Sequence, residues 1–479
     1  MTNEPRTFWK ASPLARQLLL FIVYLFPMST AVFPLVEFDT GWHLNSGRWI
    51  VEHGRVPWTD PFTTVGEDRV WIAYSWLFSL AMYGLHEWSE PIGIWLARTC
   101  LACLVVAALH GLIGRRGPSF AARMAILGFA AYALVRPLLN ERPAIFSILF
   151  TIATFAAIRR IHERRPLRLL AGLPLVYAVW ANVHIQWIHG LFLLGLSCAS
   201  LFVEWLWSKG EMPAIRRSAI LFVACAAATL VNPYGPRIYD VILSYGSNAD
   251  IYELFAELKS LEFRMPYDWA VLGIFAAACF SLGRSGGRLF DYVGLAACAY
   301  FSFHAQHEVW LVVLVSATIL AGHRVGDAEP GVTRREFAVT FGVFAAGLGV
   351  SMIAAPPAHR IDEVQRLIFP ERAVDFIANE KLPGPICAPA NWGGYIAWRL
   401  PDRRVTIDGR AALHGGPRTR RIHDLMEGKP GWRVDPDLTS AGTIVVNRYA
   451  PLAELLRLRR DYRLCYEDER AVMFAPMTK

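Results

Sequence analysis

The sequence QLLLFIVYLFPMSTAVFPLV (residues 17–36) runs directly into Glu37-Phe38-Asp39-Thr40-Gly41-Trp42-His43-Leu44. The first stretch is almost entirely apolar and about long enough to cross a bilayer. Two carboxylates and a histidine therefore stand just outside a predicted membrane-spanning segment. Charge at the edge of a membrane is costly unless it faces water, a cavity or a partner. This acidic and histidine-containing cluster is thus a candidate functional site.

Apolar runs of similar character recur along the 479 residues, of which 54% are hydrophobic and 18% charged. Repeated runs of this kind are typical of a polytopic α-helical membrane protein. They cover residues 17–36, 70–88, 92–113, 121–137, 144–161, 169–181, 188–207, 218–231, 269–282, 292–303, 309–321 and 337–355.

The net charge of +8 does not predict a nucleic-acid partner, because the arginines lie in short loops between apolar runs. The positive-inside rule expects basic residues in the cytoplasmic loops of a membrane protein. We therefore expect membrane lipids, and no nucleic acid, as partners.

The basic loops also predict the topology. If the N-terminus and the loops after residues 113, 161, 207, 283 and 322 are cytoplasmic, an even number of crossings must precede Arg115. Residues 70–88, rich in Trp, Tyr and polar side chains, then suit an interfacial or re-entrant helix, unless a short pair of spans lies elsewhere. The total becomes odd, about 11 to 13 spans, and the C-terminal tail lies outside.

This topology places the polar, non-basic motifs on one face. We expect the loop of residues 37–69 on the extracytoplasmic side, together with the later motifs. Those are residues 140–143, 182–190, 232–235 and 304–308.

From about residue 356 the composition becomes that of a soluble α/β domain of roughly 120 residues, near the usual domain size. Residues 1–355 are the predicted membrane domain, and 356–479 the predicted extracytoplasmic domain. We expect helices at 370–379, 393–400, 419–427 and 452–460, strands at 385–388, 404–407 and 442–446, and a hairpin of 462–467 with 471–474. Alternating strands and helices favour a small, partly parallel sheet.

Two tail motifs carry glycines. Asn391-Trp392-Gly393-Gly394-Tyr395 could cradle a phosphate, but it lacks the spacing of known phosphate loops, so a structural turn is favoured. Asp408-Gly409-Arg410 fits a ligand site or a turn equally well. Cys387 and Cys465 could form a disulfide if the tail is exported.

Asp39 could simply cap a helix that opens at Thr40. Glu37, His43, Arg48 and Asp60 are close to it in sequence, and such a group could instead supply a general base. Asp39 and His43 could also ligate a divalent cation.

The later motifs are weaker candidates for substrate binding. Glu141 and Arg142 could pair with each other. His184 and His189 are five residues apart, which is not the helical spacing of a zinc pair. Tyr234 and Arg237 follow a predicted helix stop and could face a lipid headgroup.

Several spaced motifs together resemble a bacterial membrane-protein family whose pattern reads roughly D-x-W-W-H-L, G-R-x-I, G-x-I-P and D-P-F. Here they are residues 39–44, 47–50, 54–57 and 60–62, and residues 182–190, 232–235, 393–395 and 408–410 also look like that family. The chain departs from the pattern at Gly41-Trp42, where paired tryptophans are usual, and at the delayed His189-Gly190.

That family is similar in layout to GT-C glycosyltransferases such as protein O-mannosyltransferases and aminoarabinose transferases. The resemblance implies an acidic residue in the first outer loop and a sugar donor on a polyprenyl-phosphate carrier. We therefore expect a glycosyltransferase at the outer face of the bacterial inner membrane, with an unknown acceptor. Asp39 would be its base, and Arg48, His43 or a cation would stabilise the departing phosphate. The alternative is a non-catalytic membrane assembly or transport factor with a periplasmic partner-binding domain.

Overall fold

The computed structural model describes residues 13–28, 37–66, 69–114, 120–163, 170–207, 212–247, 253–322, 338 and 367–477. The chain divides into two compact units. Unit 1 comprises Met1–Phe33, Trp95–Val231 and Glu257–Pro357, and unit 2 comprises Pro34–Ile94, Asn232–Ala256 and Ala358–Lys479. The loop of residues 37–69, called the outer loop after its predicted location, therefore belongs to the same unit as the C-terminal tail.

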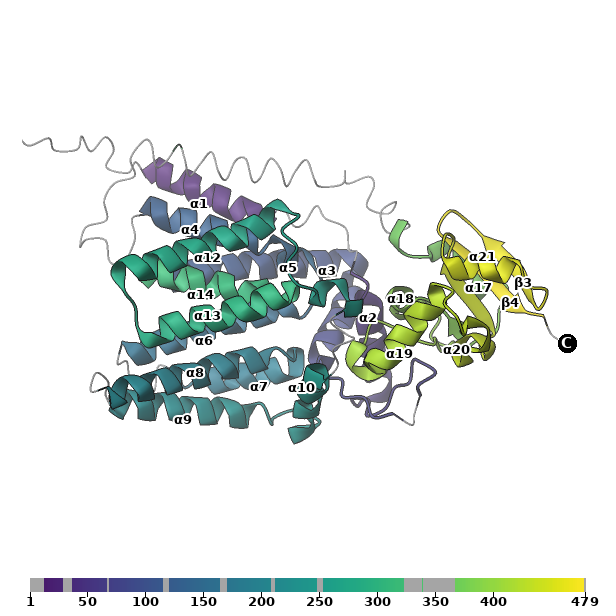
Figure 1. Cartoon of the computed structure of the whole chain (residues 1–479), viewed down its shortest axis with the longest axis horizontal. Helices are drawn as coiled ribbons and strands as arrows, with labels where there is room; N and C mark the ends of the chain where they lie inside the picture. Colours follow the sequence, from purple (N-terminus) through teal and green to yellow (C-terminus); the bar gives the residue numbers. More distant parts are fainter. Residues whose placement is uncertain are drawn as a thin grey trace, which may run out of the picture. The chain divides into compact units, whose positions relative to one another are not determined.

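Unit 1 is built from helices that lie alongside one another (Figure 1). At its centre is α14 (Val309–Gly322), which is apolar on every side and buried along almost its whole length. A helix of that kind belongs in the interior of a bundle. The other helices are α1 (Pro13–Met28), the second part of α3 (Trp76–Ile113), α4 (Phe120–Ala133), α5 (Val135–Leu139), α6 (Ala144–His162), α7 (Leu173–Val183), α8 (Trp187–Leu206), α9 (Met212–Ala228), α12 (Pro266–Ser285) and α13 (Leu289–His304).

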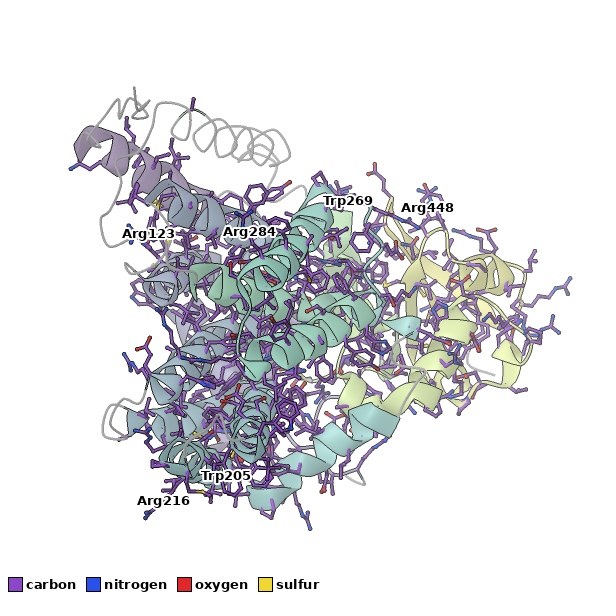
Figure 2. All side chains as sticks on the ribbon, turned by 60° about the vertical axis from the view of Figure 1, so that its left-hand side comes forward. Arg123, Trp205, Arg216, Trp269, Arg284 and Arg448 are labelled. Atoms are coloured by element: carbon purple, nitrogen blue, oxygen red, sulfur yellow. The ribbon has the colours of Figure 1, made fainter. Side chains whose placement is uncertain are left out.

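Four helical segments in the described part of the chain are long and apolar enough to cross a membrane: Ile92–Ile113, Ala144–His162, Trp187–Leu206 and Pro266–Ser285. Shorter apolar helices accompany them at Gln17–Met28, Phe120–Ala133, Leu173–Val183 and Gln306–Gly322. These helices expose large aromatic side chains such as Trp205 and Trp269, which Figure 2 labels. An outward apolar surface on long apolar helices is that of a multi-pass membrane protein.

Several predictions about topology fall outside the described residues. These are the last apolar run, 337–355 except residue 338, and the basic residues at 115–116, 164–168, 209 and 324–335. The odd span count and the orientation of the chain stay predictions.

The predicted interfacial segment 70–88 is separated from the apolar helix after it. The backbone of α3 leaves helical geometry at Ser89 (φ −155°, ψ 29°) and Glu90 (φ 48°, ψ −134°). The aromatic first part of α3 lies in unit 2, whereas the membrane-type part, from Trp95 on, lies in unit 1.

Unit 2 contains a four-stranded sheet of order β1-β2-β4-β3. β1 (Ile386–Cys387) and β2 (Thr443–Asn447) are parallel, and β4 (Ala471–Pro476) runs antiparallel to β2 and to β3 (Tyr462–Glu467). The helices of unit 2 are α2 (Thr40–His53), the first part of α3, α10 (Ile238–Ser247), α17 (Glu371–Asn379), α18 (Ala390–Arg399), α19 (Ala411–Met426), α20 (Pro436–Thr439) and α21 (Pro451–Arg457), with short 3₁₀ turns at Gly235–Arg237 and Trp432–Val434.

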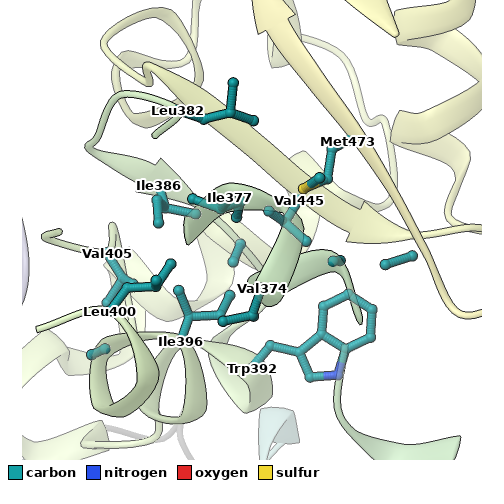
Figure 3. Packing of buried hydrophobic residues seen from close by; sticks show 14 residues of the cluster. Val374, Ile377, Leu382, Ile386, Trp392, Ile396, Leu400, Val405, Val445 and Met473 are labelled. Carbon is teal, nitrogen blue, oxygen red and sulfur yellow. The ribbon is translucent and has the colours of Figure 1, made fainter. Parts of the chain in front are cut away.

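Strand β2 is buried on both faces of the sheet, as the alternation of its side chains shows. Val445 packs on one face with Trp392, Ile396 and Met473 (Figure 3). Ile444 and Val446 point to the opposite face, where residues of α19 and α21 cover them. Successive side chains of a strand point to opposite faces, so helices on both sides of β2 exclude water from it.

Most predicted tail elements are confirmed within a residue or two, and several other features of the tail differ from the prediction. The predicted strand 404–407 pairs only through single bridges of Val405, to Ile386 and to Thr63. The motif 391–395 lies inside α18 and not in a turn. Cys387 and Cys465 are both free thiols, so the disulfide that the sequence allowed between them is not formed. The helix predicted at 419–427 begins earlier, at Ala411, and is interrupted at Gly415 (φ 73°).

Candidate functional site

Asp39 lies immediately before α2 and is half-buried. Its side chain makes no capping hydrogen bond to the first turn of α2. The Glu37 carboxylate instead accepts a hydrogen bond from the backbone N–H of Asp39 at 3.4 Å. Negative charge is favourable at a helix N-terminus. Glu37 therefore supports the start of the helix, and the Asp39 carboxylate is not used as its cap.

Helix α2 lies against α18 with almost no space between the two backbones. A Cβ on Gly41 would come within 2.6 Å of the backbone of Gly394 and Tyr395. Real Cβ atoms essentially never approach other atoms within 3.0 Å, so only glycine fits at this crossing. The glycines of the tail motif thus serve close helix packing, and they hold the helix that follows Asp39.

The Asp39 carboxylate rests on the turn Asp408-Gly409-Arg410. A Cβ on Gly409 would overlap Asp39 Oδ1 and would lie 3.6 Å from Asp39 Cγ. Trp42 Nε1, a buried donor without a hydrogen-bond partner among the described residues, would lie 3.7 Å from the same point. The Asp39 carboxylate and the Trp42 indole N–H therefore both lie beside Gly409 of the tail.

Arg410 fixes that turn from a fully buried position. Its guanidinium donates to Asp408 Oδ2 at 2.6 Å and to Asp60 Oδ1 at 2.8 Å. It also stacks over the Trp71 ring, 4.3 Å from the centroid. The Asp60 carboxylate accepts the backbone N–H groups of Phe62 and of the following residue at 3.2 Å. Asp60 is thus fully buried and held by Arg410, an arrangement that suits a structural role better than substrate contact.

The electrostatics of this cluster keep it ionised. Burial alone would raise the pKa of Asp408, but the charge of Arg410 and a hydrogen bond from His414 hold that pKa well below its usual range. The pKa of Arg410 is raised above its usual value, because Asp408 and Asp60 outweigh burial. Charges this deeply buried need such mutual pairing.

His43 is one helical turn from Asp39 and is 1% exposed. Its Nδ1 lies 2.8 Å from Ser79 Oγ, and its ring stacks on Trp42 with the centroids 3.6 Å apart. These contacts give His43 a structural role, because they hold α2 in position.

Arg48 lies two and a half helical turns after Asp39. At a rise of 1.5 Å per residue, the two residues are about 13 Å apart along the axis of α2. Its guanidinium lies 4.5 Å over the Trp398 ring and donates to Asn45. Burial lowers the pKa of Arg48. The structure therefore does not bring Arg48 next to Asp39.

Tyr234 and Arg237 are attached to the outer loop. The Tyr234 hydroxyl donates to the Pro57 carbonyl at 2.6 Å, and burial raises the pKa of Tyr234. The exposed Arg237 guanidinium lies 5.8 Å over the Trp58 ring. Both residues therefore fasten the loop within unit 2.

In unit 1, Glu141 and Arg142 do not pair with each other. Glu141 forms a buried ion pair with Arg98, and Arg142 pairs with Glu257. Neither partner was predicted. Arg98 gave a signal in the sequence, because it is the one Arg, Lys, Asp or Glu of the apolar run 92–113, and such a residue is a functional candidate by position.

A second polar group in unit 1 gathers around Glu308, which belongs to the predicted polar motif 304–308 but is not among the candidate site residues. Gln186 Nε2 donates to Glu308 Oε1 at 2.7 Å, and His189 Nδ1 lies 3.9 Å from Glu308 Oε2. His307 lies 3.1 Å from Gln186. His184 is buried beside them, with Nδ1 2.8 Å from Ser147 Oγ. The predicted residues His184 and His189 thus lie near each other with Glu308 and Gln186.

Within the described ranges, no group of three or more His, Cys, Asp and Glu side chains gathers closely enough to hold a metal ion. A cation held by Asp39 and His43 alone stays a prediction.

Comparison with known proteins identifies the fold. No family model matches the chain, and a search of curated proteins found no match. ArnT from Cupriavidus metallidurans bound to undecaprenyl phosphate is similar over 96% of this chain and 97% of that chain, with 14% sequence identity and a TM-score of 0.53. The apo state of that protein gives 16% identity and a TM-score of 0.55.

Two further solved structures agree with this likeness. The Archaeoglobus fulgidus oligosaccharyltransferase in the apo form covers 98% of this chain and 75% of that chain at 10% identity, with a TM-score of 0.52. The match to the mycobacterial arabinofuranosyltransferase AftD covers 98% of this chain and 42% of that chain at 14% identity, with a TM-score of 0.50. These neighbours share the GT-C fold, so the chain has a GT-C-like membrane-protein fold, as the resemblance predicted.

Proposed function

We propose that this protein is a GT-C-type glycosyltransferase that moves a sugar from a polyprenyl-phosphate carrier to a lipid, glycan or protein acceptor at the outer face of the inner membrane. The observation that carries the proposal is the likeness, over 96% of the chain, to a GT-C enzyme bound to undecaprenyl phosphate. Fold alone does not fix function, so the site must supply the chemistry.

Asp39 is the proposed general base. Its carboxylate accepts the proton of an acceptor hydroxyl while the hydroxyl oxygen attacks the anomeric carbon of the donor. The bond from that carbon to the phosphate oxygen breaks, and the carrier phosphate leaves with the bonding electron pair. The configuration at the anomeric carbon is inverted. The support is that Asp39 is half-buried and is not the cap of its helix.

The departing phosphate needs positive charge or hydrogen-bond donors. Arg48, His43 and a divalent cation are the groups expected from the sequence. His43 is packed against Ser79, and Arg48 lies farther along α2, so their assistance would be indirect.

The Glu308 group of unit 1 is a proposed binding site for sugar hydroxyls. Three buried atoms there have no hydrogen-bond partner among the described residues: Glu308 Oε2, His189 Nδ1 and Gln186 Oε1. Unsatisfied buried polar atoms are costly and rare in native proteins. The two oxygens are acceptors, and sugar hydroxyls would donate to them. Arg142 and His184, which interact with His307 or Glu308, would then act as supports of this group.

The test is the Asp39→Asn variant, which keeps the size of the side chain and removes its basicity. Glycolipids and glycans are extracted from cells that carry the wild type or the variant and are compared by mass spectrometry. We expect at least one glycosylated product to disappear with Asp39→Asn, while the amount of protein in the membrane is unchanged. Asp461→Asn, at an exposed carboxylate of unit 2, is the matched control and should leave all products in place. An identical set of products in Asp39→Asn cells would reject the proposal and favour the assembly factor.

A further inference from the structure

We infer that the turn Asp408-Gly409-Arg410 of the C-terminal tail is a wall of the Asp39 site, and that Gly409 is a positioning residue for the Asp39 carboxylate. This rests on the proposed function, which gives Asp39 its role as base. The tail then belongs to the catalytic site itself and is more than an acceptor-binding accessory.

The contact requires a glycine for reasons of space. A Cβ on Gly409 would overlap Asp39 Oδ1. The backbone of Gly409 is not in the left-handed region, so alanine could adopt its conformation. A methyl group at position 409 would therefore displace the Asp39 carboxylate without straining the backbone of the turn.

The turn is not free to move away from that methyl group. Arg410 is tied to Asp408 and Asp60 by buried ion pairs. Just before the turn, a Cβ on Gly393 would overlap the carbonyl oxygen of Ile407, so α18 lies directly against the chain there. Buried paired charges and touching backbones make this the rigid side of the contact.

Helix α2 is not free to move either. Gly41 touches the backbone of Gly394, and His43 is packed between Trp42 and Phe78. With both backbones fixed, the group that yields is the Asp39 side chain, which must rotate away from its position. A misplacement of about 1 Å in a reacting group can cost roughly 10²-fold in rate.

The first experiment compares Gly409→Ala with Gly84→Ala in purified full-length protein. Gly84 is a glycine of the same unit around which a Cβ would meet nothing within 4 Å. Initial transfer rates are measured with a lipid extract of the host as the donor, added in increasing amounts. We expect Gly409→Ala to lower the maximal rate about 100-fold while the half-saturating amount of extract and the thermal unfolding midpoint stay as in the wild type. Gly84→Ala should match the wild type in all three.

A second experiment tests the contact without using activity. In the double variant Asp39→Cys with Gly409→Cys, mild oxidation in membranes should join the two residues, and mass spectrometry of the digested protein should find the linked peptides. Asp39→Cys with Gly84→Cys is the control pair and should stay unlinked. Failure of the first pair to link would overturn the inference even if Gly409→Ala did not fold.

The outcomes separate the two proposals. If Asp39→Asn abolishes transfer while Gly409→Ala works at the wild-type rate, the positioning role is overturned and the proposed function stands. If Gly409→Ala loses stability together with activity, the glycine is structural and the inference fails. If Asp39→Asn changes nothing, the proposed function fails and the inference fails with it.

Discussion

At the scale of single residues, the decisive feature of unit 2 is a cation between two carboxylates. Arg410 is 6% exposed, and both Asp60 and Asp408 are at most 1% exposed. A buried pair of this kind adds little net stability compared with apolar residues, but removal of one member leaves a buried charge without its partner. The cluster therefore makes the join between the outer loop and the tail specific, because only this register places the Arg410 cation between both carboxylates.

Replacing Arg410 with Met should test this directly, since Met keeps much of the side-chain length and removes the charge. We expect a loss of about 3–5 kcal/mol in the free energy of unfolding, because two buried carboxylates lose their cation. The measurement is denaturant unfolding of full-length protein in detergent, followed by tryptophan fluorescence. Arg459→Met, at an exposed ion pair with Asp461, is the control and should unfold like the wild type. A stable Arg410→Met protein would mean that the cluster does not hold the unit together.

At the scale of elements, α2 and α18 carry the geometry of the site. Helices usually pack with their axes 8–10 Å apart, as side chains require. Here glycines replace side chains at the crossing, and Figure 1 shows α2 and α18 side by side. Because Asp39 directly precedes α2, the position of its carboxylate depends on this crossing.

Gly41→Ala should therefore destabilise unit 2, although the substitution removes no polar group. Overpacking of a tight contact costs about 1–3 kcal/mol, and the added methyl group would press on backbone atoms that cannot rotate away. The thermal unfolding midpoint of the full-length protein is the measurement. Gly84→Ala adds the same methyl group at a helical position with open space around the new Cβ. This variant should be neutral or slightly stabilising. Equal midpoints for the two variants would contradict the close crossing.

The sequence predicted what depends on local pattern. Apolar runs predicted a polytopic membrane protein, and alternation with turn signals located β2 and the β3–β4 hairpin. It did not predict partners that are remote along the chain. Asp60 and Arg410 are 350 positions apart, and no local spacing connects them. For the same reason Glu141 and Arg142, adjacent in sequence, looked like a pair, although each has a different partner in space.

At the scale of the whole molecule, unit 2 is discontinuous. It takes its residues from three segments: Pro34–Ile94, Asn232–Ala256 and Ala358–Lys479. The outer loop and the tail pack on each other, as the bridge between Thr63 and Val405 shows. The two must therefore lie on the same side of the membrane, whichever side that is.

The native cysteines can establish that side. Cys465 is half-buried on β3, whereas Cys387 is fully buried. If the tail is extracytoplasmic, a membrane-impermeant maleimide added to intact cells with a permeabilised outer membrane should modify Cys465 and leave Cys387 unmodified until the protein is denatured. Cys465→Ser identifies the labelled position. Labelling of Cys465 only after cell lysis would place the tail, and Asp39 with it, in the cytoplasm.

The discontinuity of unit 2 has a consequence for biosynthesis. Asp39 leaves the ribosome long before the turn that it rests on is made. Contacts of such long sequence separation form late and slowly. During translation, Phe62 and Trp71 of the outer loop stay exposed until the tail has been made. They form an apolar surface that chaperones would recognise. A chain that ends early has the loop and lacks its partner, so only finished molecules acquire the assembled site.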